Sequence, residues 1–440
     1  MLEGGETVME MLNQIILYIM MTFMVIGALD RIFMQFGGSE PVLGKLGLRG
    51  VGRSITGAGN EFEEGFQAMG ALALAMVGII AMAPVLAKIL SPIVVPIYTF
   101  LGADPAMFAT TLLANDMGGY FLAKEMATAA DGTINYGAWM YAGLILGAMM
   151  GPTIVFTIPV AVGIIKEQDR PYLASGVLAG IVTIPLGCIA GGFAAMASTV
   201  LIPGTNEAIQ FNLPLIFMNL IPVIIVSALI AAGLWFMPEK MIGGFSIFSK
   251  FLVAFITIGL AAAVLKTTLG ITLIPGMDPI FMTEGDEPGV DMRAIEVIGS
   301  IAIILLGAYP MVLLLTRWFE KPLLKMGGVL NVNPTAATGL IATLANNIPM
   351  FQVMKDMDSR GKILCSAFAV SAAFTFGDHL GFTAANKPDM IMAVIIGKLV
   401  GGITAVMFAM LLANRMIASI EKHGKPGPDL STSEVAEEKL

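Results

Sequence analysis

Long apolar runs separated by short polar segments dominate the chain. Nine of these runs are long enough for a transmembrane helix, which needs about 20 predominantly apolar residues. Two shorter apolar runs, at about 106–123 and 335–354, are interrupted by polar residues. The pattern therefore predicts an all-α polytopic membrane protein with about nine transmembrane helices and two re-entrant or broken-helix segments. The nine predicted spans cover residues 11–30, 66–90, 136–165, 171–199, 211–237, 247–273, 293–316, 363–385 and 389–415.

The two shorter runs carry related polar motifs. Residues 113–118 read LANDMG, and residues 344–349 read LANNIP. An Asn-Asp or Asn-Asn pair followed by Gly or Pro ends a helix and leaves backbone groups without partners. Within a bilayer, such a break is tolerated only where it faces protein or a water-filled cavity. Two equivalent breaks, one in each half of a chain, indicate the binding site of a secondary transporter.

Further matches in the same order along the chain indicate an internal repeat. Asp104-Pro105 matches Asn333-Pro334 at an offset of 229 residues, and GPTIVFT at 151–157 matches GDHLGFT at 377–383 at an offset of 226. The predicted halves cover about 60–165 and 290–400. In the predicted topology the first copy enters the membrane from inside and the second from outside, which makes the repeat inverted.

The distribution of charge sets the predicted topology. Loops rich in Lys and Arg face the cytoplasm, whereas the loop Pro275 to Asp291 holds five acidic residues without Lys or Arg and should lie outside. Nine spans with two re-entrant segments place every basic loop inside, with the N-terminus outside and the C-terminus inside. Counting both motif segments as full crossings places the basic residues between Lys166 and Lys250 on the wrong side, so the charges favour re-entrance.

Composition agrees with a membrane protein. Charged residues make up 13% of the 440 residues, about half the roughly 25% of soluble domains, and apolar residues make up 57%. We expect a short N-terminal segment at 1–10, a transmembrane domain at 11–415 and a polar, disordered tail at 416–440. The two cysteines, Cys188 and Cys365, lie in different apolar segments and predict neither a disulfide nor a metal site.

Several classes of function are disfavoured by the sequence. It contains no Walker loop, no Rossmann glycine fingerprint and no HExxH motif. We therefore expect no enzyme activity, no cofactor and no nucleic-acid partner. The lipid bilayer is the expected surrounding, and the sequence leaves the oligomeric state open, a homo-oligomer included.

The breaks carry the candidate binding residues. Asp116 and Asp378 lie within apolar sequence, where an ionised carboxylate is costly unless it has a partner, so they could hold a cationic substrate or a coupling ion. Asn115, Asn346 and Asn347 would supply oxygen atoms for an ammonium or hydroxyl group. Alternatively, Asp116 caps the next helical turn and Asp378 pairs with a basic residue.

His379 has a functional and a structural interpretation, and Lys398 has a structural one. His379 is the only histidine within the apolar region, and it could relay protons or simply orient the loop. Coupling to H⁺ and coupling to Na⁺ both remain open. Lys398 is expected near a span end, where its long side chain could reach the interface.

Long runs of this chain resemble the ethanolamine permease family of bacterial ethanolamine-utilization operons. The resemblance covers about 10–415 and is carried by runs such as LLANDMGGYFLAKE (112–125), GAMMGPTIVFTIPVA (147–161), RAIEVIGSIAIILLGAYPMVLLLTRWFEKP (293–322) and FGDHLGF (376–382). It implies uptake of ethanolamine across the bacterial cytoplasmic membrane to supply an ammonia-lyase inside a microcompartment. Ethanolamine is mostly protonated at neutral pH, so carboxylate, amide and carbonyl oxygens could replace its hydration shell.

Two hypotheses from different classes follow. The first is a permease that carries ethanolamine by alternating access, with Asp116 and Asp378 holding the ammonium. The second is an ion-translocating membrane subunit of a larger complex, such as a Na⁺-pumping decarboxylase. In that case the Asn and Asp residues would bind Na⁺, and the chain would need a soluble partner subunit.

Overall fold

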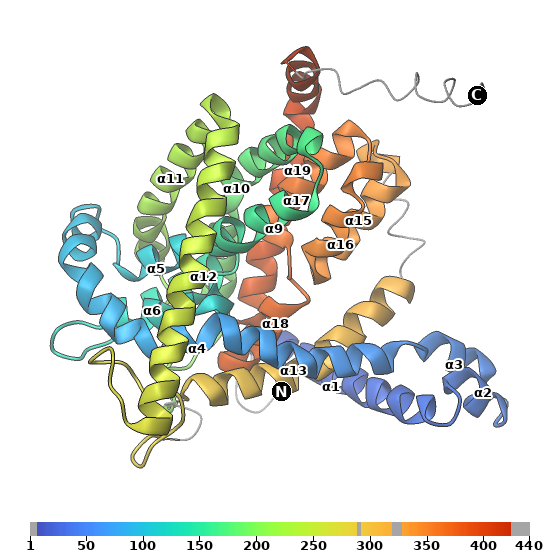
Figure 1. Cartoon of the computed structure of the whole chain (residues 1–440), viewed down its shortest axis with the longest axis horizontal. Helices are drawn as coiled ribbons and strands as arrows, with labels where there is room; N and C mark the ends of the chain where they lie inside the picture. The colour runs from blue at the N-terminus through green and yellow to red at the C-terminus, as the bar shows by residue number, and fades with distance from the viewer. Residues whose placement is uncertain (1–6, 288–291, 319–327, 424–440) are drawn as a thin grey trace, which may run out of the picture.

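The computed structural model describes residues 7–287, 292–318 and 328–423, and these are almost entirely helical (Figure 1). Within these ranges the only strand-type pairings are two isolated bridges, Thr128 with Ile134 and Leu201 with Ala208. The helices are α1 (Val8–Met34), α2 (Ser39–Gly44), α3 (Arg49–Ile55), α4 (Ala58–Phe100), α5 (Ala106–Leu112), α6 (Gly119–Met126), α7 (Tyr136–Met140), α8 (Met150–Pro152), α9 (Ile158–Ile164), α10 (Arg170–Met196), α11 (Leu213–Phe236), α12 (Pro238–Leu269), α13 (Ala294–Trp318), α15 (Pro334–Ala345), α16 (Asn347–Gln352), α17 (Ser359–Ala372), α18 (Asp378–Asn386) and α19 (Ile391–His423).

Eight helical segments of the described residues are long and apolar enough to cross a membrane, and eight of the nine predicted spans each overlap one of them over most of their length. The ninth prediction, 363–385, is not a continuous helix. Helix α17 ends at Ala372 and α18 begins at Asp378, with Phe374 between them in the left-handed region (φ 62°). The apolar residues on both sides of this break give the run the composition of a span, although its backbone is interrupted.

The predicted C-terminal boundary also differs from the structure. Helix α19 continues to His423, so residues 416–423 are helical instead of forming part of a disordered tail. The remainder of the predicted tail, 424–440, lies outside the described residues.

Capping side chains explain where several helices begin. Thr7 accepts a hydrogen bond from the Glu10 backbone N–H, while the Glu10 carboxylate accepts one from the Thr7 N–H, which forms a capping box for α1. Asn333 caps α15 and Asp358 caps α17 through their side-chain oxygens. Each such cap contributes about 1 kcal/mol by satisfying an N–H of the first turn.

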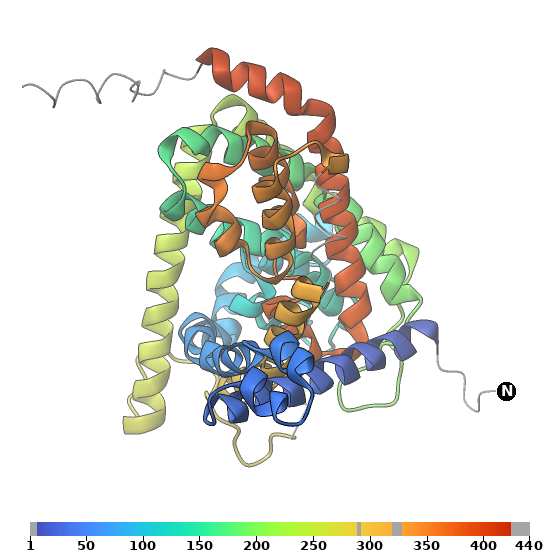
Figure 2. The ribbon, with the colours of Figure 1, turned by 90° about the vertical axis from the view of Figure 1, so that its right-hand side faces the viewer.

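The long helices form two packed groups. Helix α13 packs against α4 and α1, which we call the first group, and α10 packs against α19 and α17, which we call the second group. In Figure 1 the first group lies across the direction of α12 and α19, and Figure 2 shows α12 and α19 on opposite sides of the molecule. The short helix α18 contacts α13 of the first group and α19 of the second group.

The segment Tyr136–Ile164 lies deepest among the candidate spans of the described residues, with 78% of its apolar window buried. Its backbone widens into π-helical turns at Tyr141–Leu146 and Thr153–Thr157, on either side of α8. Such widened turns leave carbonyl groups for other partners and are frequent near functional sites. Both cysteines of the chain, Cys188 in α10 and Cys365 in α17, are free thiols that are fully buried.

Each Asn motif lies against the backbone of a second interrupted segment. The Asn115 N–H donates to the Gly147 carbonyl at 2.9 Å, and a Cβ at Gly151 would overlap the Leu113 carbonyl oxygen. A backbone N–H freed at one break thus forms its hydrogen bond with a backbone carbonyl of another interrupted segment.

The second half shows the same kind of contact. The Phe376 N–H donates to the Leu344 carbonyl at 2.9 Å, and a Cβ at Gly377 would overlap the Ala345 carbonyl oxygen. The sequence match pairs Gly151 with Gly377, so equivalent glycines make equivalent contacts. The inverted repeat itself stays a prediction.

Candidate functional site

The first Asn motif forms a tight turn between two short helices. Asn115–Met117 is a single 3₁₀ turn between α5 and α6, and Gly118, with φ 83°, reverses the chain before α6. Asn115 is fully buried, and neither its amide nitrogen nor its amide oxygen has a hydrogen-bond partner among the described residues. The Asp116 side chain is 16% exposed. A buried amide without a partner beside a partly exposed carboxylate is a polar surface that a ligand or water can satisfy.

The second Asn motif is built differently. The Asn346 side-chain oxygen accepts a hydrogen bond from the Ile348 N–H at 2.9 Å and so caps α16. Asn347 is fully buried, and its amide nitrogen donates to the Thr157 hydroxyl at 2.9 Å. Its amide oxygen has no partner within the described ranges. Among the described residues, neither Asn346 nor Asn347 forms a hydrogen bond with Asp116 or Asp378.

The break between α17 and α18 supplies a second carboxylate and the histidine. The Tyr309 hydroxyl, from α13, donates a hydrogen bond to Asp378 Oδ1 at 2.7 Å. The next residue, His379, is 1% exposed, and its Nε2 lies 3.8 Å from Asp116 Oδ1. The charges of Asp116 and Asp378 are also close enough to interact. The structure therefore brings the two predicted acidic residues and the predicted histidine into one cluster.

The position of Lys398 corrects one expectation. This side chain does not reach the interface: it is 1% exposed, and its Nζ lies 2.9 Å from Nδ1 of His379. It also donates to the Ala148 carbonyl, beside the first Asn motif. The side chain points into the protein because α19 packs against α10 and α18, which cover this face of the helix.

Lys398 and Tyr309 are the two site residues that the sequence prediction missed. For Lys398 a signal was present, because a single lysine within the Gly-rich apolar run Ile391–Gly402 is costly in a membrane and marks a functional position by default. Tyr309 lies in an ordinary apolar helix, and tyrosines at such positions commonly reach an interface. Nothing in the sequence around Tyr309 indicates a bond to Asp378.

The cluster combines two acidic groups with one basic group. A protonated Lys398 donates to Nδ1 of His379, so a neutral imidazole carries its hydrogen on Nε2, toward Asp116. When all three groups are ionised, two carboxylates and one ammonium leave one negative charge without a counter-charge. An unpaired buried charge is costly, so the cluster favours the binding of one monovalent cation.

The cluster joins the two helix groups. Tyr309 belongs to α13 of the first group and Lys398 to α19 of the second, while Asp116 and Asp378 lie at helix breaks. No group of three or more His, Cys, Asp or Glu side chains in the described part of the chain could hold a metal ion. The expectation that the protein needs no cofactor stays a prediction.

Comparisons with known proteins identify the family of this chain. A family model described as "Ethanolamine utilisation protein, EutH" matches residues 12–412. The chain is 64% identical over 411 residues to a protein of Escherichia coli K12 named "Probable ethanolamine permease EutH", covering 93% of this chain and 98% of the relative. A Salmonella typhimurium protein of the same name is 65% identical over 91% of this chain and 95% of its own length. A third relative of that name, from Listeria monocytogenes, is 55% identical over 92% and 95%. No solved structure matches the chain.

Proposed function

Since the chain belongs to the EutH family of ethanolamine utilisation proteins, we propose that it is a permease for ethanolamine. It is a multi-pass membrane protein, with eight apolar helices among the described residues that are long enough to span a bilayer. Its role is transport, not catalysis, and it takes up ethanolamine across the cytoplasmic membrane by alternating access. No observation favours the alternative of an ion-translocating subunit in a larger complex.

The observation that carries the proposal is the buried cluster of two carboxyl groups and one amine, which has one net negative charge when all three groups are ionised. Protonated ethanolamine brings one positive charge and would neutralise it. Asp116 and Asp378 hold the ammonium group, because Asp116 lies 3.8 Å from His379 and Asp378 directly precedes His379 in the chain. A charge-assisted hydrogen bond to a carboxylate is about twice as strong as a neutral one.

The amide groups of the Asn motifs contact the hydroxyl group. Asn115 is the main candidate, because both polar atoms of its buried amide lack a partner among the described residues. Asn347 offers its unpartnered amide oxygen, while its nitrogen is held by Thr157. Asn346 contributes indirectly, since its side-chain oxygen is committed to the start of α16.

Movement of the two helix groups relative to each other gives access from each side in turn. The cluster lies where α13 and α19 are joined through α18, so a change in that junction opens or closes the path to the carboxylates. In this proposal the N-terminus lies outside and the C-terminus inside, as the basic loops indicate.

The test is uptake of labelled ethanolamine into proteoliposomes that contain the purified chain. Uptake is measured at acidic pH, because the neutral amine crosses lipid unaided and would hide a carrier. Wild-type protein should give saturable uptake, and Asp116→Asn and Asp378→Asn should each lower it at least tenfold. Asp131→Asn, which removes an exposed loop carboxylate, is the matched control and should leave uptake unchanged. Wild-type uptake no faster than that of empty liposomes would exclude a carrier that works alone.

A further inference from the structure

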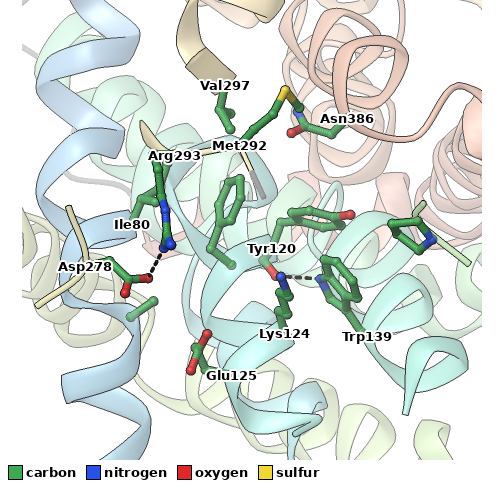
Figure 3. Close-up of a pocket in the computed structure, with 13 residues that line it drawn as sticks. Ile80, Tyr120, Lys124, Glu125, Trp139, Asp278, Met292, Arg293, Val297 and Asn386 are labelled. Carbon is green, nitrogen blue, oxygen red and sulfur yellow. Dashed lines mark hydrogen bonds and ion pairs between the residues drawn. The ribbon is translucent and has the colours of Figure 1, made fainter. Parts of the chain in front are cut away.

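A second polar cavity lies apart from the carboxylate cluster, between α4, α6, α7 and α13. It encloses about 90 Å³, several times the ~10–15 Å³ that one water molecule needs. Figure 3 shows the Asp278–Arg293 ion pair on one side of this cavity and the rings of Tyr120 and Trp139 on the other. Asp278 belongs to the acidic loop, so the cavity lies on the side of the protein that carries this loop. We call it the outer pocket.

The aromatic wall of the outer pocket is already in contact with an alkylammonium group. The Lys124 ammonium lies over the Trp139 ring, 5.3 Å from its centroid. The ring orientation is fixed, because the Trp139 indole N–H donates to the Tyr120 carbonyl at 2.9 Å and the two rings pack 4.9 Å apart. Ammonium groups at this distance from an indole are attracted by its π face.

The carboxylates of the outer pocket differ in how far they are paired. Arg293 pairs with Asp278 at 3.2 Å and with Asp286 at 2.7 Å, so both of these carboxylates have a basic partner. Glu125 lines the same pocket, and its carboxylate has no hydrogen bond or ion pair among the described residues. A carboxylate beside aromatic rings that no hydrogen bond or direct ion pair occupies is suited to an organic ammonium ion.

One lining residue of the outer pocket, Tyr120, lies close in the chain to the carboxylate cluster. Tyr120 follows Asp116 by four residues, and Phe382 follows Asp378 by four residues. The rings of Tyr120 and Phe382 pack edge to face with 5.6 Å between their centroids, and both are buried. Through this aromatic pair the wall of the outer pocket contacts α18, the helix that begins at Asp378.

We infer that the outer pocket is a second binding site for a small primary ammonium compound, occupied before the compound passes Tyr120 and Phe382 to reach Asp116. The inference rests on the proposed function for the identity of the ligand. Glu125 and the Trp139 ring hold the ammonium, and Lys124 is displaced from the ring when the ligand binds.

The fluorescence of Trp139 provides a direct test. The chain has three tryptophans, and the other two, Trp235 and Trp318, are 64% and 47% exposed and can be replaced by Phe. Titration of this single-tryptophan protein with ethanolamine hydrochloride should give a saturable change in emission. Sodium chloride at equal ionic strength and ethylene glycol, which lacks the ammonium, should give none. An equal response to ethylene glycol would overturn the assignment of an ammonium site.

Variants separate the outer pocket from the carboxylate cluster. Glu125→Gln should weaken the response at least tenfold and Glu125→Asp should retain most of it, while Lys124→Met should strengthen binding severalfold by exposing the ring. Gel filtration of each variant shows whether it is folded. Asp116→Asn should keep the Trp139 response while it loses uptake. A response that disappears in Asp116→Asn but survives in Glu125→Gln would overturn the inference. Saturable binding without uptake in the wild type would instead contradict the proposed function and leave the outer pocket standing.

Discussion

The ammonium nitrogen of Lys398 lies 2.9 Å from Nδ1 of His379, and both side chains are 1% exposed. The other ring nitrogen, Nε2, faces Asp116 at 3.8 Å. One imidazole thus connects the basic group of α19 to the acidic group of the first Asn motif. The stability of the buried cluster and its affinity for a cation are therefore linked through the charge of Lys398.

Replacing Lys398 by methionine should destabilise the protein by about 3–5 kcal/mol, because it leaves two buried carboxylates without a counter-charge. Adding Asp116→Asn to Lys398→Met should recover much of this loss, since the surplus charge is then reduced. Thermal unfolding in detergent, followed by circular dichroism, measures both effects. A double variant no more stable than Lys398→Met alone would show that the two charges do not compensate each other.

Asn115→Ala should raise the KM for ethanolamine about tenfold, which corresponds to about 1.4 kcal/mol, with little change in the unfolding temperature. The reason is that the Asn115 amide has no side-chain partner in the described structure to lose. Asn347→Ala is the matched comparison and should cost about 1 kcal/mol of stability, because it removes the bond to Thr157. Earlier unfolding of Asn115→Ala with an unchanged KM would mean that its amide has a structural role.

Gly151→Ala should reduce the yield of folded protein sharply. Its Cβ would overlap the Leu113 carbonyl oxygen. Overpacking against side chains usually costs about 1–3 kcal/mol, and a backbone atom moves aside less readily than a side chain. Gly163→Ala is the control, because the space around this glycine of α9 is open and alanine favours the helix by up to about 1 kcal/mol. Gel filtration and the unfolding temperature measure the result, and equal behaviour of the two variants would contradict the close backbone contact.

The acidic loop should lose order as the pH falls below about 3.9, the ordinary pKa of aspartate. Hydrogen bonds from Arg293 hold the pKa of the Asp286 carboxyl well below its usual range. A lowered pKa in the folded state means that the stabilisation is complete above the unfolded pKa and disappears as the pH falls through the folded pKa. Pepsin digestion at pH 4 and pH 2 should therefore cleave the segment Gly270 to Glu287 faster at pH 2 than the change in pepsin activity explains.

Two variants test this pH dependence. Asp286→Asn should be cleaved readily at both pH values, because it lacks the charge that Arg293 holds. Glu284→Gln changes an exposed acid of the same loop and should behave like the wild type. Equal protection of Asp286→Asn and wild type at pH 4 would contradict the role of the Asp286–Arg293 pair.

Much of the fold could be predicted from apolar run length alone. Eight helical segments of the described residues have the length and hydropathy that a bilayer requires, and the Asn motifs indicated the two short breaks through their own chemistry. The break at Gly377 was harder to place, because its effect depends on a distant carbonyl, that of Ala345. Hydropathy measures composition within a window and does not report such contacts.

The candidate site could be predicted only in part. Asp116, Asp378 and His379 were found because ionisable groups are rare in apolar sequence, and the structure places them together. Asn346 lies apart from the carboxylate cluster and Tyr309 belongs to it, and both facts depend on how distant helices pack. A sequence gives the cost of burying a polar group, while the partner that offsets this cost is decided by tertiary structure.

The burial of Cys188 and Cys365 has a practical consequence for mapping sidedness. Both thiols are 0% exposed and lie within packed helices, so maleimide reagents in water should not reach them in the folded protein. A cysteine introduced at Val8 or Ala418, near the two ends of the described chain, would then be the accessible thiol of an otherwise natural sequence. Labelling of intact cells with a membrane-impermeant maleimide could report which terminus faces the medium without first removing any native residue.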